Sequence, residues 1–247
     1  MGSTGRDRRL DGKVPIFFYH RIGSLPAGEP NRRLTVTPER FAFQMWLMAR
    51  IGYRTMSMDA LAECVRAGRV PRKRFVISFD DGFADLHDYA MPVLERHGFS
   101  AIVYLVAERI GQTDTWDEGL GFPLQPLLNC EQIESMARRG IEFGSHTCTH
   151  ARLTDLGDDK LGDEVCRSRQ VIEAALHRPV MHFCYPYGAW DARVARAAAD
   201  AGYATAVTTR RGRARARAGL DLLMLPRVKI SKGTGNLRFL LNLAFKY

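Results

Sequence analysis

The sequence predicts an α/β fold, a distorted or incomplete (β/α) barrel of about seven parallel strands covered by helices. Three observations support this prediction: short apolar segments alternate with helical patterns along most of the 247 residues, several helical patterns end at a glycine, and no internal repeat interrupts the order. Repeated strand–helix units require a parallel sheet that helices cover. We expect a flexible N-terminal arm over residues 1–12 and a single folded domain over residues 13–247.

The predicted elements follow one another in a regular order. Strands are expected at VPIFFY (14–19), YRTMS (53–57), RFVISF (74–79), SAIVYLV (100–106), IEFGS (141–145), MHFCY (181–185) and YATAVT (203–208). The first helix should begin at Thr37-Pro38-Glu39, where a capping side chain precedes a proline. Further helices are expected at 58–68, 86–97, 131–139, 159–176 and 192–201.

Two segments break this alternation. Residues 108–129 predict a long loop with glycine and proline, of a length that usually serves function or moves. The tail, TGNLRFLLNLAFKY, has apolar residues at near-helical spacing: Leu237, Leu240, Leu241, Leu243 and Phe245. We expect a terminal helix packed on the core, with contact to a membrane surface or oligomerisation as the alternatives.

The charge balance favours an anionic partner. Lys and Arg number 36 against 27 Asp and Glu, which gives a formal charge of +9 and a pI of about 9.6. Five arginines lie within Arg210–Arg217, among Gly and Ala, and this run is interpreted first as a solvated, mobile loop and second as a clamp for phosphate or acidic glycan. Because the run has no interleaved aromatics, nucleic acid is not expected as a partner.

The chain is expected to be cytoplasmic. Its five cysteines lie far apart with no C-x-x-C pair, so neither a disulfide framework nor a zinc knuckle is indicated. The N-terminus has an apolar run too short for a signal sequence, and no stretch approaches the roughly 20 apolar residues of a membrane span. The basic residues would allow peripheral contact with the anionic inner face of the membrane.

Two adjacent carboxylates follow the apolar segment RFVISF. Asp80 and Asp81 should emerge at the carboxyl end of this strand, where the active sites of barrels are built. Successive residues at a strand end can point in different directions, so one carboxylate could bind a metal while the other faces the attacking water. Taken alone, Asp-Asp-Gly would more often be a solvated turn.

Two histidines follow the strand IEFGS in the same way. His146 and His150 lie four positions apart, and a turn between them would let both imidazoles converge with a carboxylate on a zinc-type site. Such pairs also occur by chance, as surface or core histidines. A third segment, HFCYPYG, places a Pro-Tyr-Gly turn after a strand, and this turn could hold the Tyr187 backbone N–H toward a reacting carbonyl as an oxyanion donor.

Taken together, the segments SFDDG, SHTCTH and YPYG resemble, in this order and spacing, the first three motifs of the polysaccharide deacetylase family. This family is also called the NodB-homology domain or carbohydrate esterase family four. The resemblance covers roughly residues 13–210, and the opening VPIFFYHRI is similar to the branch of poly-N-acetylglucosamine deacetylases. It implies a distorted (β/α) barrel, Asp80 as general base, Tyr187 as oxyanion donor, and Asp81, His146 and His150 as ligands of a divalent metal. Zinc is the expected ion, with Ni²⁺, Co²⁺ or Fe²⁺ as substitutes.

The sequence departs from the family pattern at two places. The arginine that many members carry two residues before the Pro-Tyr pair, where it braces the catalytic Asp, is Cys184 here. The C-terminal Leu-x-His motif is also missing, since LMLPRVKI contains Arg227 and no histidine. The usual general acid is therefore absent, and His20, at the end of the first strand, is the predicted substitute. The alternative for His20 is a structural histidine bonded to a neighbouring loop.

The predicted activity is metal-dependent removal of an N-acetyl group from an amino sugar, which could be an oligosaccharide, a glycan precursor, a lipid-linked sugar or a secondary-metabolite glycoside. Trp116, Asp117, Trp190 and Arg227 are the predicted substrate contacts, although tryptophans near a barrel mouth are as often packing residues. Two alternatives remain open. One is hydrolysis of another non-peptide amide, such as a cyclic imide or a formamide, and the other is a catalytically silent module that binds glycan or phospholipid.

Overall fold

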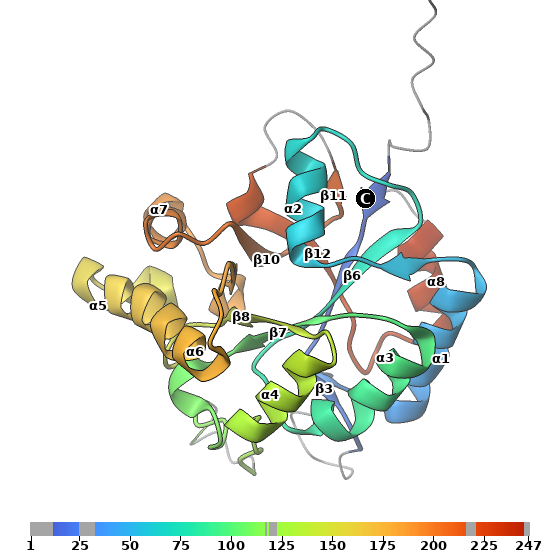
Figure 1. Cartoon of the computed structure of the whole chain (residues 1–247), viewed down its shortest axis with the longest axis horizontal. Helices are drawn as coiled ribbons and strands as arrows, with labels where there is room; N and C mark the ends of the chain where they lie inside the picture. The colour runs from blue at the N-terminus through green and yellow to red at the C-terminus, as the bar shows by residue number, and fades with distance from the viewer. Residues whose placement is uncertain (1–11, 25–32, 117, 119–122, 216–220, 245–247) are drawn as a thin grey trace, which may run out of the picture.

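Seven parallel strands close into a barrel in the computed structural model, which describes residues 12–24, 33–116, 118, 123–215 and 221–244 (Figure 1). Every neighbouring pair in the ring is parallel, and the pairing of β2 with β6 closes it. The predicted fold class is therefore confirmed, and the barrel is closed rather than incomplete. Around the ring the strands are β2 (Ile16–Tyr19), β12 (Leu225–Lys229), β10 (Thr205–Arg211), β9 (His182–Cys184), β8 (Glu142–Ser145), β7 (Ile102–Leu105) and β6 (Arg74–Phe79).

One strand of the ring was not among those predicted. Strand β12 completes the barrel between β10 and β2, whereas the predicted strand YRTMS shortens to β5 (Arg54–Thr55), which lies outside the ring beside β6. Two small pairs add to the barrel. Antiparallel β1 (Lys13–Val14) and β11 (Ala214–Arg215) form one, and β3 (Arg21–Ile22) and β4 (Thr35–Val36) form the other. Of the predicted arm over residues 1–12, only Gly12 belongs to the described part of the chain.

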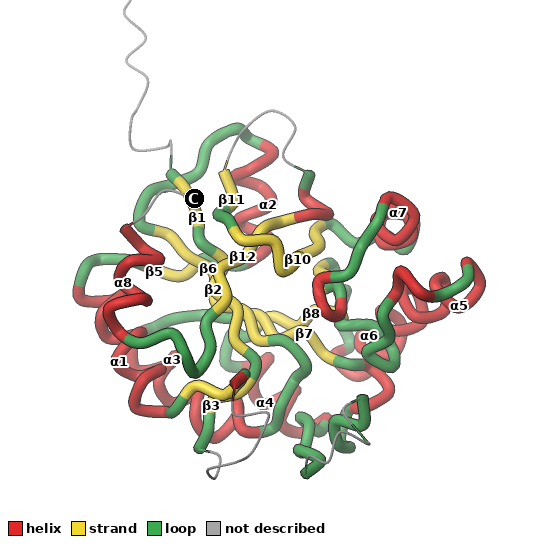
Figure 2. Tube along the Cα trace, turned by 180° about the vertical axis from the view of Figure 1, so that it is seen from behind, coloured by secondary structure: helices red, strands yellow, loops and turns green. Residues whose placement is uncertain are grey.

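Helices surround the strands on the outside of the barrel (Figure 2). The first begins as predicted, with the Thr37 hydroxyl accepting from the Arg40 N–H and Pro38 in the first turn. The segments predicted as helices at 86–97 and 159–176 each contain a π-helical turn, Leu86–Ala90 and Asp163–Arg167. The α-helices are α1 (Pro38–Arg50), α2 (Met58–Arg66), α3 (Met91–His97), α4 (Cys130–Arg138), α5 (Asp158–Gly162), α6 (Ser168–Leu176), α7 (Ala192–Asp200) and α8 (Asn236–Ala244).

The alternation of side chains along each strand divides the core in two. Outward residues such as Phe17, Ile77 and Phe79 pack against the surrounding helices in one buried cluster. Inward residues such as Ile16 and Val76 form a second cluster with the apolar side chains of α2. Because α2 packs on inward residues near the amino ends of the strands, it covers that end of the barrel. The functional side chains lie at the opposite end, where the strands have their carboxyl ends.

The C-terminal helix forms as predicted, but a different face of it is buried. Phe239 is fully buried against Phe17, with ring centroids 5.1 Å apart, whereas Leu237, Leu240 and Leu241 are exposed by 71%, 38% and 41%. Phe245 and the side chain of Leu243 lie outside the described residues. None of the described helices has the length and apolar composition that crossing a membrane requires.

The arginine run does not form the predicted mobile loop in its described part. Arg211 belongs to β10 and donates to the side chain of Asn242, and Arg213 donates to the backbone carbonyl of the same residue. These contacts tie the run to α8. Residues 216–220 lie outside the described part of the chain.

Candidate active site

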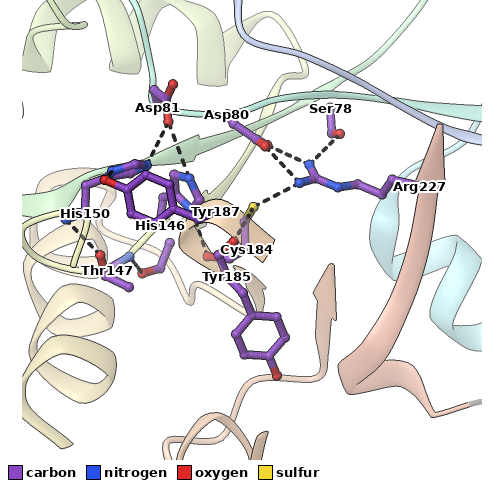
Figure 3. A network of polar contacts seen from close by, with 11 residues as sticks. Ser78, Asp80, Asp81, His146, Thr147, His150, Cys184, Tyr185, Tyr187 and Arg227 are labelled. Atoms are coloured by element: carbon purple, nitrogen blue, oxygen red, sulfur yellow. Dashed lines mark hydrogen bonds and ion pairs between the residues drawn. The ribbon is translucent and has the colours of Figure 1, made fainter. Parts of the chain in front are cut away.

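Asp80 and Asp81 follow β6 and are both buried, each 4% exposed. Strand alternation points Asp80 inward, two residues after the inward Ser78. Asp81 has a left-handed φ of 73°, and Gly82 follows with a φ of 76°. This backbone turn directs the two neighbouring carboxylates to different partners (Figure 3).

A tight turn after β8 brings the two histidines together. The Thr147 hydroxyl accepts from the His150 N–H at 3.0 Å, and both residues have a left-handed φ, of 70° and 67°. As a result Nε2 of His146 and Nε2 of His150 each lie 3.4 Å from the same oxygen of Asp81, Oδ1. Figure 3 shows both rings pointing to this carboxylate.

The donor set of Asp81, His146 and His150 fits a divalent metal of the zinc type. One ligand atom from each residue lies within 4.8 Å of the others. His146 Nδ1 is 2.7 Å from the carbonyl oxygen of Cys184. Because a carbonyl can only accept, Nδ1 donates to it, and Nε2 would present its lone pair to a bound metal, the arrangement in which histidines usually bind metal. Burial opposes ionisation of Asp81, but hydrogen bonds with His146 and His150 outweigh it and hold the pKa of Asp81 well below its ordinary value.

Asp80 is held by an arginine from another strand. Arg227 Nη1 and Nη2 donate to the two carboxylate oxygens at 2.6 and 2.8 Å. The same guanidinium donates to the Thr208 carbonyl, the Ser78 hydroxyl and the Cys184 sulfur, and it lies 4.1 Å from the centre of the Phe18 ring. Burial would raise the pKa of Asp80, but the charge and hydrogen bonds of Arg227 lower it below the ordinary value. The carboxylate is therefore ionised at neutral pH.

This geometry gives Arg227 a different role from the predicted contact with substrate. Arg227 as a whole residue is 1% exposed, and its hydrogen bonds go to Asp80 and the neighbours of Asp80. It also accounts for Cys184, which stands where the resemblance implies an arginine. Arg227 brings a guanidinium to Asp80 from β12, and the small Cys184 side chain contacts it at 3.3 Å.

The Pro-Tyr-Gly turn lies beside the histidines. Tyr187 has a φ of 59° and Gly188 a φ of 67°, and a Cβ on Gly188 would lie 2.0 Å from the Thr209 hydroxyl, so this position requires glycine. The Tyr187 hydroxyl is 3.1 Å from His150 Nδ1. Its ring is 48% exposed and lies under the Arg152 guanidinium.

These residues line a pocket of about 270 Å³ at the carboxyl ends of the strands. His20 lies in its wall, and its Nδ1 is buried without a hydrogen-bond partner in the described structure. Burial lowers the pKa of His20 below its ordinary value, against the opposing charges of Asp81 and Asp80. The lining residues are Phe18, His20, Leu34, Asp80, Asp81, Trp116, His146, His150, Tyr185, Tyr187, Gly188, Thr209 and Lys229.

The predicted aromatic contacts divide between the pocket and the core. Trp116 lines the pocket and stacks on His150, with ring centroids 4.4 Å apart and 30° between the planes. Trp190 is partly buried and packs against the outer core cluster, and it is not among the residues that line this pocket. Asp117 lies outside the described residues.

Comparison with known proteins identifies the family of this chain. YxkH of Bacillus subtilis, whose name assigns it to the polysaccharide deacetylases, is 28% identical over 228 residues, which cover 92% of this chain and 75% of that protein. Poly-beta-1,6-N-acetyl-D-glucosamine N-deacetylase of Staphylococcus epidermidis is 24% identical over 190 residues, 73% of this chain and 62% of the relative. The structure of the Streptococcus pyogenes deacetylase PplD, solved in complex with acetate, has a TM-score of 0.80 and 26% identity over 93% of this chain and 97% of its own. The family model for polysaccharide deacetylase matches residues 67–206, more than half of the sequence, and the chain belongs to this family.

Proposed function

We propose that the protein removes an N-acetyl group from an amino sugar, with a divalent metal, zinc by preference, bound to Asp81, His146 and His150. The observation that carries the proposal is the separation of roles between two adjacent carboxylates. Asp81 faces two imidazoles, and Asp80 faces the pocket with Arg227 behind it. Similarity to an N-acetylglucosamine deacetylase supports an N-acetylated sugar as the substrate class.

A divalent ion at this site would supply Lewis-acid polarisation of the amide carbonyl and would acidify the attacking water. Asp80 is the proposed general base. Because Arg227 lowers its pKa, Asp80 is ionised over the whole neutral range and can accept the proton of that water. The two hydrogen bonds from the Arg227 guanidinium also fix the orientation of the Asp80 carboxylate, so the base needs little reorganisation before it reacts.

Two further groups complete the proposed reaction. The Tyr187 backbone N–H is the proposed oxyanion donor, and it belongs to a turn in which Thr209 leaves no room for a side chain at Gly188. His20 is the proposed general acid, and its protonated form would donate to the departing amine. His20 lines the pocket in which the substrate would bind, which supports this role.

The test is acetate release from N-acetylglucosamine oligosaccharides, lipid-linked N-acetylated sugars and small N-acetylglucosaminides, with chelator and then with zinc restored. We expect release that chelation abolishes and zinc restores. Asp80→Asn and His146→Ala should each lower turnover by a factor of about 1,000 or more, because they remove the base and a ligand. Asp159→Asn, an exposed aspartate on α5, is the matched control and should retain full activity.

Other outcomes would favour the alternative functions. Metal binding that depends on His146 and His150, without acetate from any sugar, would move the proposal to another amide, such as a cyclic imide or a formamide. Glycan or phospholipid binding that survives chelation, without metal or acetate, would favour a non-catalytic binding module.

A further inference from the structure

Five successive backbone N–H groups belong to the turn from His146 to His150, here called the histidine turn, and each has a hydrogen-bond acceptor. The His146 N–H donates to the Leu105 carbonyl at 2.7 Å. The His150 N–H donates to the Thr147 hydroxyl at 3.0 Å, and the Thr147 N–H donates to the Ser145 hydroxyl at 3.2 Å. The two N–H groups in the middle need an acceptor from elsewhere, because a buried N–H without a partner is costly.

A carboxylate from a helical segment accepts these two middle N–H groups. Oε2 of Glu164 lies 2.8 Å from the Cys148 nitrogen and 3.0 Å from the Thr149 nitrogen, and Oε1 accepts from the Thr149 hydroxyl. Glu164 belongs to the π-helical turn Asp163–Arg167 between α5 and α6, and such turns often occur at functional sites. Because hydrogen bonds to a carboxylate are stronger than those to a neutral oxygen, Glu164 is a firm attachment for the histidine turn.

The same helical segment holds the beginning of the histidine turn. The Ser145 hydroxyl, which accepts from the Thr147 N–H, donates to the Ser168 hydroxyl of α6 at 2.8 Å. Both serines are fully buried. On the other side, two N–H groups that follow β7 donate to carbonyls of the turn. The fold therefore fixes the two ends of the turn, and Glu164 fixes the N–H groups in its middle.

The backbone of the histidine turn needs such support. Thr147 and His150 have φ angles of 70° and 67°, in the left-handed region that residues with a side chain rarely adopt. Such conformations cost energy and persist only where the surrounding contacts hold them. Without the carboxylate of Glu164, the turn would sample other conformations in which the two imidazoles no longer converge on Asp81.

We propose that Glu164 is a positioning residue for metal binding, because its carboxylate holds the histidine turn in the shape in which both imidazoles converge on Asp81. The inference rests on the proposed metal site. Glu164 contacts the two residues in the middle of the turn, so it acts on the ligands through the backbone. A site that is correctly formed for only a fraction of the time binds its ligand more weakly in proportion to that fraction.

Zinc affinity tests the proposal without turnover. Glu164→Ala should bind zinc about tenfold or more weakly than the wild type, measured by competition with a chelator. Glu164→Gln should stay within about threefold of the wild type, because its amide oxygen can accept both N–H groups as Oε2 does. Glu63→Ala, which removes an exposed glutamate from α2, is the matched control and should bind as the wild type does. Equal zinc affinity in the wild type and Glu164→Ala would overturn the proposal.

Amide hydrogen exchange of the zinc-free protein tests the contact itself. In Glu164→Ala the amides of Cys148 and Thr149 should exchange about tenfold or more faster than in the wild type, because their acceptor is lost. The His146 amide should keep its protection, since its acceptor is a strand carbonyl. Weaker zinc binding with unchanged exchange at the two middle amides would show that Glu164 acts by its charge alone, and would overturn its positioning role.

A second variant covers the case in which Glu164→Ala loses protection throughout the barrel. Glu164→Asp keeps the charge, but its side chain is one methylene shorter and should not reach both amides. It should therefore weaken zinc binding and speed exchange at the two middle amides, whereas Glu164→Gln should do neither by more than about threefold. Wild-type behaviour of Glu164→Asp in both measurements would contradict the proposal.

Failure of the deacetylase function would give a different pattern. A wild-type protein that binds zinc, with weaker binding in Glu164→Ala and no acetate released from any sugar, would keep the role of Glu164 and reject deacetylation. A wild-type protein that binds no zinc through Asp81, His146 and His150 would reject the metal site and the role of Glu164 in it.

Discussion

Arg227 and Asp80, which lie 147 positions apart in the chain, form a buried ion pair with two hydrogen bonds, at N–O distances of 2.6 and 2.8 Å. The side chains are 0% and 5% exposed, so both charges are almost completely buried. A pair of this kind adds little to stability in comparison with apolar residues of the same size, but removing one partner leaves an uncompensated charge. Its benefit here lies in the fixed direction and ionised state of Asp80.

Arg227→Lys should therefore impair catalysis more than folding. A lysine keeps the charge but cannot form the two parallel bonds. We expect kcat to fall by about 100-fold and KM to stay within a factor of about three of the wild-type value. The reason is that the variant changes the orientation of the base but not the binding of the substrate. Because the pKa of Asp80 would rise toward its ordinary value, the acidic limb of the rate profile should move to higher pH. Arg196→Lys is the control. An acidic limb that does not shift in Arg227→Lys would contradict the conclusion that the two hydrogen bonds of Arg227 lower the pKa of Asp80.

His20→Gln tests the proposed general acid. With an amide substrate, kcat should fall by about 100-fold or more, because the departing amine is left without a proton donor. With 4-nitrophenyl acetate, whose leaving group needs no proton, the variant should keep a rate near that of the wild type. Equal losses on both substrates would show that His20 supports the structure of the pocket instead.

If His20 is the general acid, its deprotonation determines the expected fall of activity on the alkaline side of the pH profile. Burial lowers the pKa of His20, so its protonated form is lost as pH rises through a value below the ordinary imidazole pKa of about 6.5. Activity with amide substrates should decline over that range. This limb should be missing from the profile of His20→Gln, measured as kcat/KM against pH.

Zinc binding should be visible without any turnover. A ligand that binds only the folded state raises the melting temperature, by an amount that grows with its concentration relative to Kd. We expect added zinc to raise the Tm of the chelated wild type by several degrees and to leave His150→Ala unchanged. His97→Ala, a partly exposed histidine at the end of α3, is the control and should respond as the wild type does.

The strand-end motifs were predictable from sequence because each is local. SFDDG and SHTCTH follow apolar strands, and parallel strands bring their carboxyl ends to one side of a barrel, so the convergence of Asp81 with His146 and His150 follows from topology. The contact of Arg227 with Asp80 had no local signal. Pro226 weakens the strand pattern of LPRVK, and nothing in that segment indicates which carboxylate its arginine faces.

Tertiary packing explains the other differences between the predicted and the observed positions of side chains. On α8 the buried face is set by what it rests on, and it contains the aromatic Phe239 and the polar Asn242 rather than the leucines. Trp116 and Trp190 both lie in loops near the barrel mouth. Only the three-dimensional path of each loop determines that Trp116 covers His150 while Trp190 packs on the core.

Glu142, at the start of β8 and far from the catalytic groups in the barrel, predicts a pH-dependent stability. Its Oε2 accepts from the Met58 N–H at 2.8 Å, at the beginning of α2. Burial raises its pKa from 4.5 to about 7, with a contribution from the charge of Asp59. Between pH 4.5 and about 7, Glu142 is therefore protonated in the folded protein and ionised in the unfolded chain. The stability due to this group is fully present below pH 4.5 and is lost as pH rises through about 7.

Glu142→Gln should remove this dependence while preserving the hydrogen bond to α2, because the amide oxygen can accept in place of the carboxyl. The free energy of unfolding of the wild type relative to the variant should decrease by up to about 3 kcal/mol between pH 4.5 and 7.5, measured by urea denaturation. His182, whose pKa burial lowers, acts in the opposite direction and is present in both proteins. Glu134→Gln, an exposed glutamate on α4, is the control. Parallel pH profiles for the wild type and Glu142→Gln would show that this carboxyl titrates near its ordinary pKa.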